Sequence, residues 1–294
     1  MPKTKRSETP SPIPAPGEIV RLPLLAMRGF IITPYFNFSF IATRHPTISA
    51  AERARQLKPP RMAVFCQRND SDELPEAKAL YPVGVLCSLI SCQSPAENPA
   101  QRKVQLEGVC RITLVRIINA DDGTCREAEV QLLPEPEESP RDLEECRRML
   151  IMCLDNAQER EAAEGELLKN GNGAAQQKML ARARATQDLS VCTDVLSHLL
   201  KLDDSLRHIM LQTASPLERA RLLIATLNGF TYRVEIERKV VTAARQSMER
   251  HQREYFLNEQ MRAIRQELGV ADQEESEINA LRVREQELAA PAYV

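Results

Sequence analysis

The chain has 294 residues, of which 43% are apolar and 27% charged, the composition of a soluble globular protein with room for about two domains. Aromatic residues make up only 4% and tryptophan is absent, so the core has to be built mainly from leucine, isoleucine, valine and methionine. The 39 basic and 41 acidic side chains give a formal charge of -2, which excludes a global field that would attract nucleic acid or an anionic membrane.

The first segment, residues 1–17, is basic at its start and then carries prolines at every second position from Pro10 to Pro16. A signal peptide would need an apolar segment there, so we expect a disordered leader instead. The most apolar stretch, residues 30–42, is interrupted by Pro34 and is shorter than the ~18 to 20 residues of a membrane-spanning helix. No membrane partner is therefore expected.

Strand patterns predict a small, mostly β domain over residues 18–133. Compact apolar runs at 61–66 and 83–92 are separated by residues that form turns. Only one helix is expected in this domain, over residues 47–57. Two consecutive prolines that follow it are expected to end it.

The clearest strand pattern is the alternation of apolar and polar side chains over residues 104–117. Gly108 interrupts this alternation, which predicts a bulge or a strong bend. The turn sequence DDG at 121–123 then leads into residues 127–133, so the two segments are expected to form a hairpin.

A linker of low apolar content, residues 134–140 (PEPEESP), separates the β domain from a helical subdomain over residues 141–229. Apolar residues now recur at helical spacing, and the sequence NGNG at 170–173 is expected to end the first helix. The sequence SPLE at 215–218 is a strong helix start, with a serine that can cap and a proline in the first turn. Gly229 is well placed to end that helix.

A single long helix is expected over residues 230–269, because glycine and proline are absent from residues 230–268. Glu235 with Lys239 and Glu249 with Arg253 are favourable pairs four residues apart. The apolar positions repeat every seven residues and then continue after a phase shift: Val234, Val241, Met248 and Tyr255, followed by Leu257, Met261, Ile264 and Leu268.

Two interpretations of this helix remain open. It is either a solvated helix packed on its own bundle or a protruding coiled-coil arm, because its apolar stripe needs a partner surface. Beyond it, residues 270–294 form an acidic tail that is expected to be poorly ordered.

The chemistry of common enzymes is missing from the sequence. None of the ten glycines precedes a lysine, so the phosphate-binding loop is absent, and the HExxH, GxSxG and SxxK motifs are absent too. The eight cysteines have no CxxC spacing and no histidine at zinc-ligand spacing, which indicates reduced thiols in a cytoplasmic protein and no metal site. Ser197 and Lys201 could touch on a helix, but nothing nearby indicates an oxyanion hole. We therefore expect no catalytic residue.

Three blocks resemble Lon-type ATP-dependent proteases and occur in that family's order. The first is RLPLLAMR at 21–28 with the apolar run that follows it, and the second combines YPVGV at 81–85 with VQLEGVCRITLVRI at 104–117. The third and most specific is HQREYFLNEQMRAIRQELG at 251–269, which is similar to the long helix that precedes the Lon ATPase module. The resemblance covers about residues 18–269.

The resemblance implies an α+β fold: a β-rich, pseudo-barrel-like domain, a helical bundle and one long coiled-coil-like helix. It also implies a substrate-recognition and assembly region that captures unfolded or degradation-tagged polypeptides for a hexameric machine. Two segments depart from the family pattern, FIITPY at 30–35, which lacks the usual Pro-Gly pair, and residues 156–186, which look like an extended insertion. Lon proteases continue beyond the last matched block into an ATPase and a Ser-Lys peptidase, so ATP and magnesium are expected there and not in this chain.

The expected mechanism is an exposed apolar patch that binds non-native chains, positioned by the long helix. Core packing is the competing interpretation of every residue in that patch. The candidate polypeptide-binding residues are Met27, Phe30, Ile31, Pro34 and Phe36 in the β domain, with Tyr255, Phe256 and Met261 on the long helix.

Three other functions remain as alternatives. The chain could be a freestanding, non-catalytic adaptor or scaffold that dimerises through its long helix, which its mass in solution would reveal. A hydrolase with an unfamiliar site would turn over peptide or ATP, and a nucleic-acid-binding protein would show salt-dependent binding. The interleaved charges of the long helix favour a solvated face over a stripe that binds nucleic acid.

Overall fold

The computed structural model describes residues 13–95, 98–120, 125–161, 167–168, 173–267 and 270–287. Residues 1–12, which hold most of the expected leader, lie outside this part. The chain divides into two compact units, Met1–Tyr232 and Arg233–Val294. The first unit holds the β domain and the helical subdomain.

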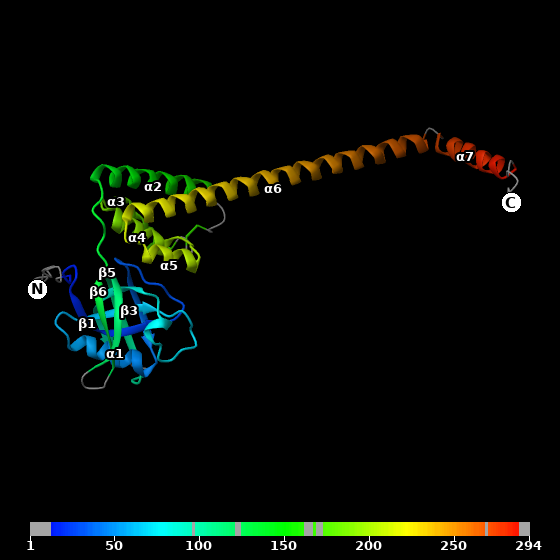
Figure 1. Cartoon of the computed structure of the whole chain (residues 1–294). Helices are drawn as coiled ribbons and strands as arrows, with labels where there is room; N and C mark the ends of the chain where they lie inside the picture. Colours follow the sequence, from blue (N-terminus) through cyan, green and yellow to red (C-terminus); the bar gives the residue numbers. More distant parts are fainter. Residues whose placement is uncertain are drawn as a thin grey trace, which may run out of the picture. The chain divides into compact units, whose positions relative to one another are not determined.

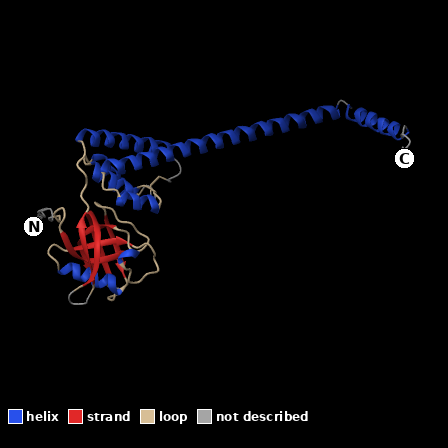
Figure 2. Ribbon diagram, viewed as in Figure 1, coloured by secondary structure: helices blue, strands red, loops and turns tan. Residues whose placement is uncertain are grey.

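Six strands form the β domain, in the order β2-β5-β4-β3-β1-β6, and β5 also pairs with β6. Figure 2 shows the strands gathered in one body. The long strand β5 pairs through its first half with β2 and through its second half with β6, so the sheet curls into a barrel-like body. This confirms the predicted pseudo-barrel-like domain. The strands are β1 (Ile19–Met27), β2 (Asn37–Ala42), β3 (Arg61–Cys66), β4 (Val83–Gln93), β5 (Arg102–Asn119) and β6 (Arg126–Leu132).

Two apolar clusters lie on opposite faces of this sheet. Strand β3 is buried along its whole length, with Met62 and Val64 in one cluster and Ala63 and Phe65 in the other. Helix α1 (His45–Gln56) closes one cluster with three fully buried alanines, and the short 3-10 helix η1 (Ala77–Ala79) precedes β4.

The bulge predicted at Gly108 is present. Leu86 pairs with Cys110 and Cys87 with Gly108, so Val109 is an extra residue in β5. A β-carbon at position 108 would lie 2.5 Å from the carbonyl oxygen of Thr33, so only glycine lets the segment before β2 approach β5 this closely. Strands β5 and β6 form the predicted hairpin pairing, whereas its turn at 121–123 lies outside the described residues.

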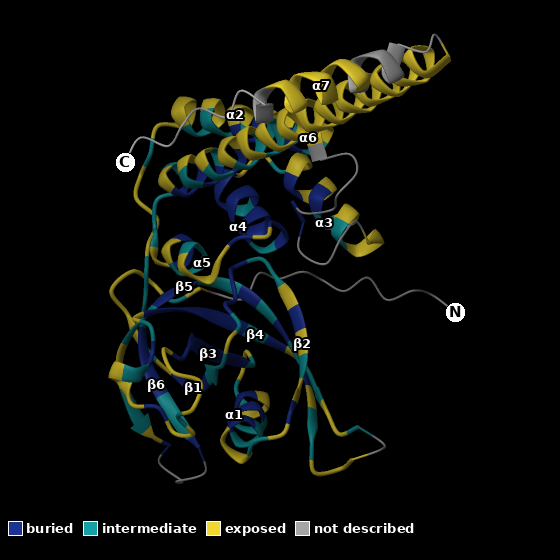
Figure 3. Ribbon diagram, turned by 90° about the vertical axis from the view of Figure 1, so that its right-hand side faces the viewer, coloured by how far each residue is buried: buried dark blue, intermediate teal, exposed yellow. Residues whose placement is uncertain are grey.

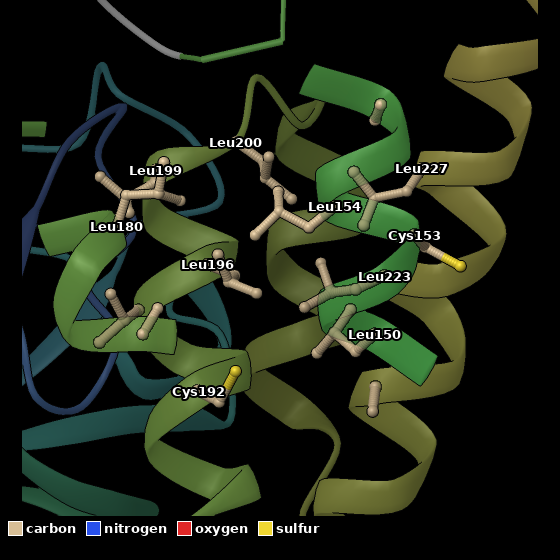
Figure 4. Close-up of a cluster of buried hydrophobic side chains, with 14 of the residues drawn as sticks. Leu150, Cys153, Leu154, Leu180, Cys192, Leu196, Leu199, Leu200, Leu223 and Leu227 are labelled. Carbon is tan, nitrogen blue, oxygen red and sulfur yellow. The ribbon is translucent and has the colours of Figure 1, made fainter. Parts of the chain in front are cut away.

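Helices α2 to α5 and the start of α6 surround one leucine-rich core, shown in Figure 4. Helix α3 contributes the buried Leu180 and Ala183, so the expected insertion at 156–186 takes part in the core. The NGNG sequence expected to end α2 lies mostly outside the described residues, and α2 is described only to Glu161. The helices are α2 (Pro140–Glu161), α3 (Ala174–Ala185), α4 (Leu189–Leu199), α5 (Asp204–Gln212) and α6 (Pro216–Glu267).

Helix α6 begins as predicted but does not end at Gly229 (Figure 1). The Ser215 hydroxyl accepts a hydrogen bond from the Glu218 amide at 3.1 Å, as expected of a cap. The helix then continues through Gly229, because one glycine costs only about 1 kcal/mol in a helix whose neighbours favour helix on both sides. The long helix expected to start at residue 230 is therefore the second part of a 52-residue helix.

The acidic tail also differs from the prediction, because residues 270–287 form helix α7 (Val270–Glu287). This segment contains neither glycine nor proline, and most of its residues are charged or polar, so its composition is compatible with a solvated helix. Within the described ranges, the structure contains no helix with the length and apolarity that membrane crossing requires.

Candidate functional site

The five candidate residues of the β domain do not form the expected exposed patch. Ile31 and Pro34 are buried, and Met27, Phe30 and Phe36 are half-buried. Four of them, all except Pro34, belong to or pack against the apolar cluster of the β domain. Core packing, the competing interpretation, therefore describes their surroundings better.

The segment that carries these residues joins the β domain to the helical subdomain. The ring centroid of Phe36 lies 3.3 Å from that of His198 in α4, and Phe30 meets the same imidazole edge-on at 6.0 Å. The Thr33 hydroxyl donates to the backbone carbonyl of Asp194 at 3.3 Å. Helix α4 thus packs against the residues between β1 and β2.

A buried charge network lies at the centre of this junction. Asp194 has no exposed side-chain surface, and its carboxylate accepts a hydrogen bond from Arg111 of β5 at 2.7 Å. Arg219 of α6 is equally buried and lies 3.5 Å from the same carboxylate. The guanidinium of Arg219 also donates to Glu135 in the linker at 2.9 Å. Two cations and two anions therefore compensate one another where a sheet, a linker and two helices meet.

The network also satisfies its remaining donors. The Arg111 Nε donates to the carbonyl of Leu211 at the end of α5, at 3.0 Å. Burial alone would lower the pKa of Arg111, but the charge and hydrogen bonds of Asp194, together with the charges of Glu135 and Tyr35, outweigh burial and raise the pKa. Burial raises the pKa of nearby Tyr35, and the carboxylates of Glu135 and Asp194 raise it further. These groups hold the junction together and offer no free catalytic group.

The serine considered for catalysis has a structural role. The buried Ser197 hydroxyl donates to the carbonyl of Asp194 within α4 at 2.8 Å. In the part of the chain that the structure describes, no cluster of three or more potential ligands could hold a metal ion. The eight cysteines are thiols, and burial raises the pKa of Cys66, Cys110 and Cys192 to about 11.

A groove of about 670 Å³ lies beside the junction, between the segment after β3 and helix α5. The ring of Tyr81 stacks on His208 of α5 at 3.5 Å, and the guanidinium of Arg68 lies 4.6 Å from the centre of the tyrosine ring. Ile31 is part of the apolar wall, and Ile209 on the opposite side is 48% exposed. The buried candidate Ile31 therefore borders this groove.

The stacked His208 predicts a pH dependence of stability. Burial lowers its pKa and the charge of Arg68 lowers it further, whereas Asp204 opposes them. A histidine with a depressed folded pKa contributes stability above its unfolded pKa and loses it as the pH falls through the folded value. When the pH is lowered from about 7.5 to about 5.5, the melting temperature of the wild-type protein should therefore fall slightly more than that of His208→Phe. The phenylalanine keeps the stacking but cannot titrate. Parallel losses in both proteins would contradict this.

The three candidates on α6 are exposed as predicted, with exposed fractions of 70% for Tyr255, 63% for Phe256 and 52% for Met261. They belong to a longer series, and Figure 3 shows this part of α6 as exposed surface. The large apolar residues exposed between positions 236 and 264 are Ile236, Val240, Val241, Met248, Tyr255, Phe256, Leu257, Met261 and Ile264.

Charged pairs lie among these apolar residues on α6. Lys239 pairs with Glu235 at 3.2 Å, as predicted, whereas Glu249 pairs with Arg245 at 3.5 Å and not with the predicted Arg253. Such pairs support an exposed helix only weakly, by roughly 0.3 to 0.5 kcal/mol each. They do not explain why large apolar side chains face water.

Comparison with known proteins identifies the family of this fold. The model of the ATP-dependent protease La (LON) substrate-binding domain matches residues 21–229. The chain belongs to the Lon substrate-binding domain family. The match ends at the glycine that α6 passes through, so the long exposed part of α6 lies beyond the matched domain.

Lon proteases also match along most of the chain. The chain is 27% identical to the Lon protease of Rhizobium meliloti over 91% of its own length and 31% of that protein. It is 28% identical to the Lon protease of Nitratidesulfovibrio vulgaris over 92% of its length and 32% of that protein. The chain therefore spans about a third of the length of these relatives.

A solved structure has the same fold. The N-terminal domain of the Mycobacterium avium complex Lon protease superimposes with a TM-score of 0.55 at 16% identity, covering 71% of this chain and 98% of that domain. This structure confirms the α+β fold, and the family model together with the Lon relatives confirms the resemblance read from the three sequence blocks.

Proposed function

We propose that this chain binds unfolded or degradation-tagged polypeptides and presents them to the ATPase and serine peptidase modules of a cytoplasmic Lon protease. The observation that carries the proposal is the series of nine large apolar side chains exposed on α6 between positions 236 and 264. Exposed apolar surface of this extent marks a contact site in a soluble protein. Membership of a substrate-binding domain family supports a polypeptide as the partner.

In this proposal the chain binds the polypeptide, and other modules of the protease hydrolyse ATP and peptide bonds. The β domain and the helical subdomain are joined by a buried charge network, and α6 is one continuous helix of 52 residues whose first part belongs to the helical core. ATP, magnesium and the Ser-Lys dyad belong to the other modules of the proposed protease, and the full protein is proposed to assemble as a hexamer. This chain alone is then expected to turn over neither ATP nor peptide.

The binding surface on α6 can be tested by serine substitution. The variant Tyr255→Ser, Phe256→Ser and Met261→Ser should bind a reduced and alkylated, permanently unfolded protein at least about tenfold more weakly, a loss of about 1.4 kcal/mol or more. Fluorescence anisotropy of the labelled unfolded protein measures the dissociation constant.

A matched control lies on the same stretch of helix. The variant Gln252→Ser, Asn258→Ser and Gln260→Ser introduces the same three serines at exposed polar positions. It should bind like the wild type, because it removes little apolar surface. Equal weakening in both variants would show that helix propensity and not apolar contact determines binding, and unchanged binding in both would remove α6 from the proposed surface.

The alternative is a scaffold that dimerises through α6. The heptad positions Val241, Met248 and Tyr255 are 67%, 67% and 70% exposed, which favours a coiled-coil partner. Light scattering over a range of concentrations separates the two functions. A dimer that masks α6 and binds no unfolded protein would favour the scaffold.

A further inference from the structure

Among the residues that the structure describes, strand β2 is the one edge strand of the barrel-like sheet. In the part of the chain that the structure describes, every other strand pairs on both sides, whereas β2 pairs only with β5. Proteins protect such edges with charged residues, proline or bulges. The six residues of β2, NFSFIA, include no charge and no proline, and their pairing with β5 runs without a register shift. Figure 3 shows β2 at the margin of the sheet.

The backbone groups that point away from β5 can be assigned. The Gly108 amide donates to the carbonyl of Phe36 at 2.9 Å, and hydrogen-bonded pairs recur at every second residue of an antiparallel ladder. The next such pairs with β5 therefore fall on Phe38, Phe40 and Ala42. The N–H and C=O groups of the intervening residues, Asn37, Ser39 and Ile41, face away from β5.

The side chains along this edge are apolar at alternate positions. Phe36, Phe38 and Phe40 stack in a row, with ring centroids 6.3 and 6.0 Å apart, and Phe36 and Phe40 are half-buried. On the other face, Ile41 is 57% exposed. An added strand would place alternate side chains against the aromatic row and its backbone against the free groups of β2.

We propose that an extended, apolar segment of an unfolded polypeptide adds to β2 as a further strand of the sheet. The inference rests on the proposed polypeptide-binding function and gives it a second site and a recognition mode. Backbone hydrogen bonds require no particular side chain, so this mode suits a partner defined by lack of structure and not by sequence. A second copy of β2 is the poorer occupant, since two six-residue edges bury far less than the ~1,600 Å² of a standard stable interface.

The test uses the whole chain and a matched pair of variants at Ser39. Ser39→Pro removes the amide that faces away from β5, and Ser39→Ala keeps it, so both retain the pairing of β2 with β5. A fluorescein-labelled short peptide of alternating valine and threonine serves as the probe. Ser39→Pro is expected to bind the peptide at least tenfold more weakly than Ser39→Ala, which should bind like the wild type.

Two further measurements keep the proposal testable if Ser39→Pro folds poorly. The same peptide N-methylated at every amide keeps its side chains but cannot donate hydrogen bonds, and it should lose at least tenfold in affinity for the wild type. Ile41→Lys changes an exposed side chain at the edge and should weaken binding while keeping the circular-dichroism melt.

Distinct outcomes overturn distinct claims. Equal affinity of the methylated and unmethylated peptides, or of the two Ser39 variants, would overturn strand addition even if the unfolded protein still binds. A mass in solution that falls in Ser39→Pro but not in Ser39→Ala would assign the edge to a second copy and also overturn it. If wild-type protein bound neither the peptide nor the unfolded protein, the proposed function itself would fail.

Discussion

Replacing Asp194 by asparagine is expected to lower the free energy of unfolding by about 3 to 5 kcal/mol, because it leaves two buried arginines without their shared counter-ion. The side chains of Arg111 and Arg219 are 3% and 0% exposed, so water cannot replace the lost charge. The same change disturbs the sheet and the helices together, since the network connects β5, α4 and α6. Urea unfolding followed by circular dichroism measures the loss.

The matched control is Asp155→Asn. Asp155 pairs with Arg184 on the surface of the helical subdomain, where the two side chains are 47% and 39% exposed. Exposed pairs contribute about 0 to 1 kcal/mol, so this variant should unfold within about 1 kcal/mol of the wild type. Similar urea midpoints for Asp194→Asn and Asp155→Asn would contradict the central role of the buried network.

Gly84→Ala is expected to destabilise the β domain by about 1 to 3 kcal/mol or more, the usual effect of overpacking a core. A β-carbon at position 84 would lie 2.6 Å from the ring of Phe65 and would also meet the carbonyl oxygen of Val64. The backbone of β3 cannot move away, because β3 pairs with β4 on one side and with β1 on the other. Thermal unfolding should show a lower melting temperature for Gly84→Ala than for the wild type.

Gly229→Ala is the matched control, and its effect on the stability of the protein should have the opposite sign. No atom lies within 4 Å of a β-carbon built at this position inside α6, and the residue is exposed. Alanine favours helix over glycine by about 1 kcal/mol, so the variant should be slightly more stable than the wild type. Destabilisation by Gly229→Ala would mean that α6 bends or ends there after all.

The local patterns predicted strand β5 and the start of helix α6 because one face of each is buried. Alternation over residues 104–117 identified β5, and the break at Gly108 identified its bulge. The start of α6 was equally clear from the sequence, since Ser215 accepts a hydrogen bond from the Glu218 amide as a cap should. The position of a helix end was harder: Gly229 has the right local chemistry for an end, but the favourable residues on both sides continue the helix.

The junction was not predicted, because its members are far apart in the sequence. Arg111 falls on the polar face of an alternating strand, where a solvated arginine is the ordinary expectation. Only the fold brings Asp194 and Arg219 to it, from 83 and 108 residues away. The same reason explains the β-domain candidates: Phe30 and Phe36 were expected in an exposed apolar patch, but His198 from a distant helix lies against them.

The most direct test of the proposed function is a titration of the whole chain with a labelled polypeptide in two forms, native and permanently unfolded by reduction and alkylation. We predict saturable binding of the unfolded form with a dissociation constant in the micromolar range, about -8 kcal/mol, and no measurable binding of the native form. Equal affinity for both forms, or no binding of the unfolded form at concentrations up to about 100 μM, would contradict polypeptide recognition by this chain.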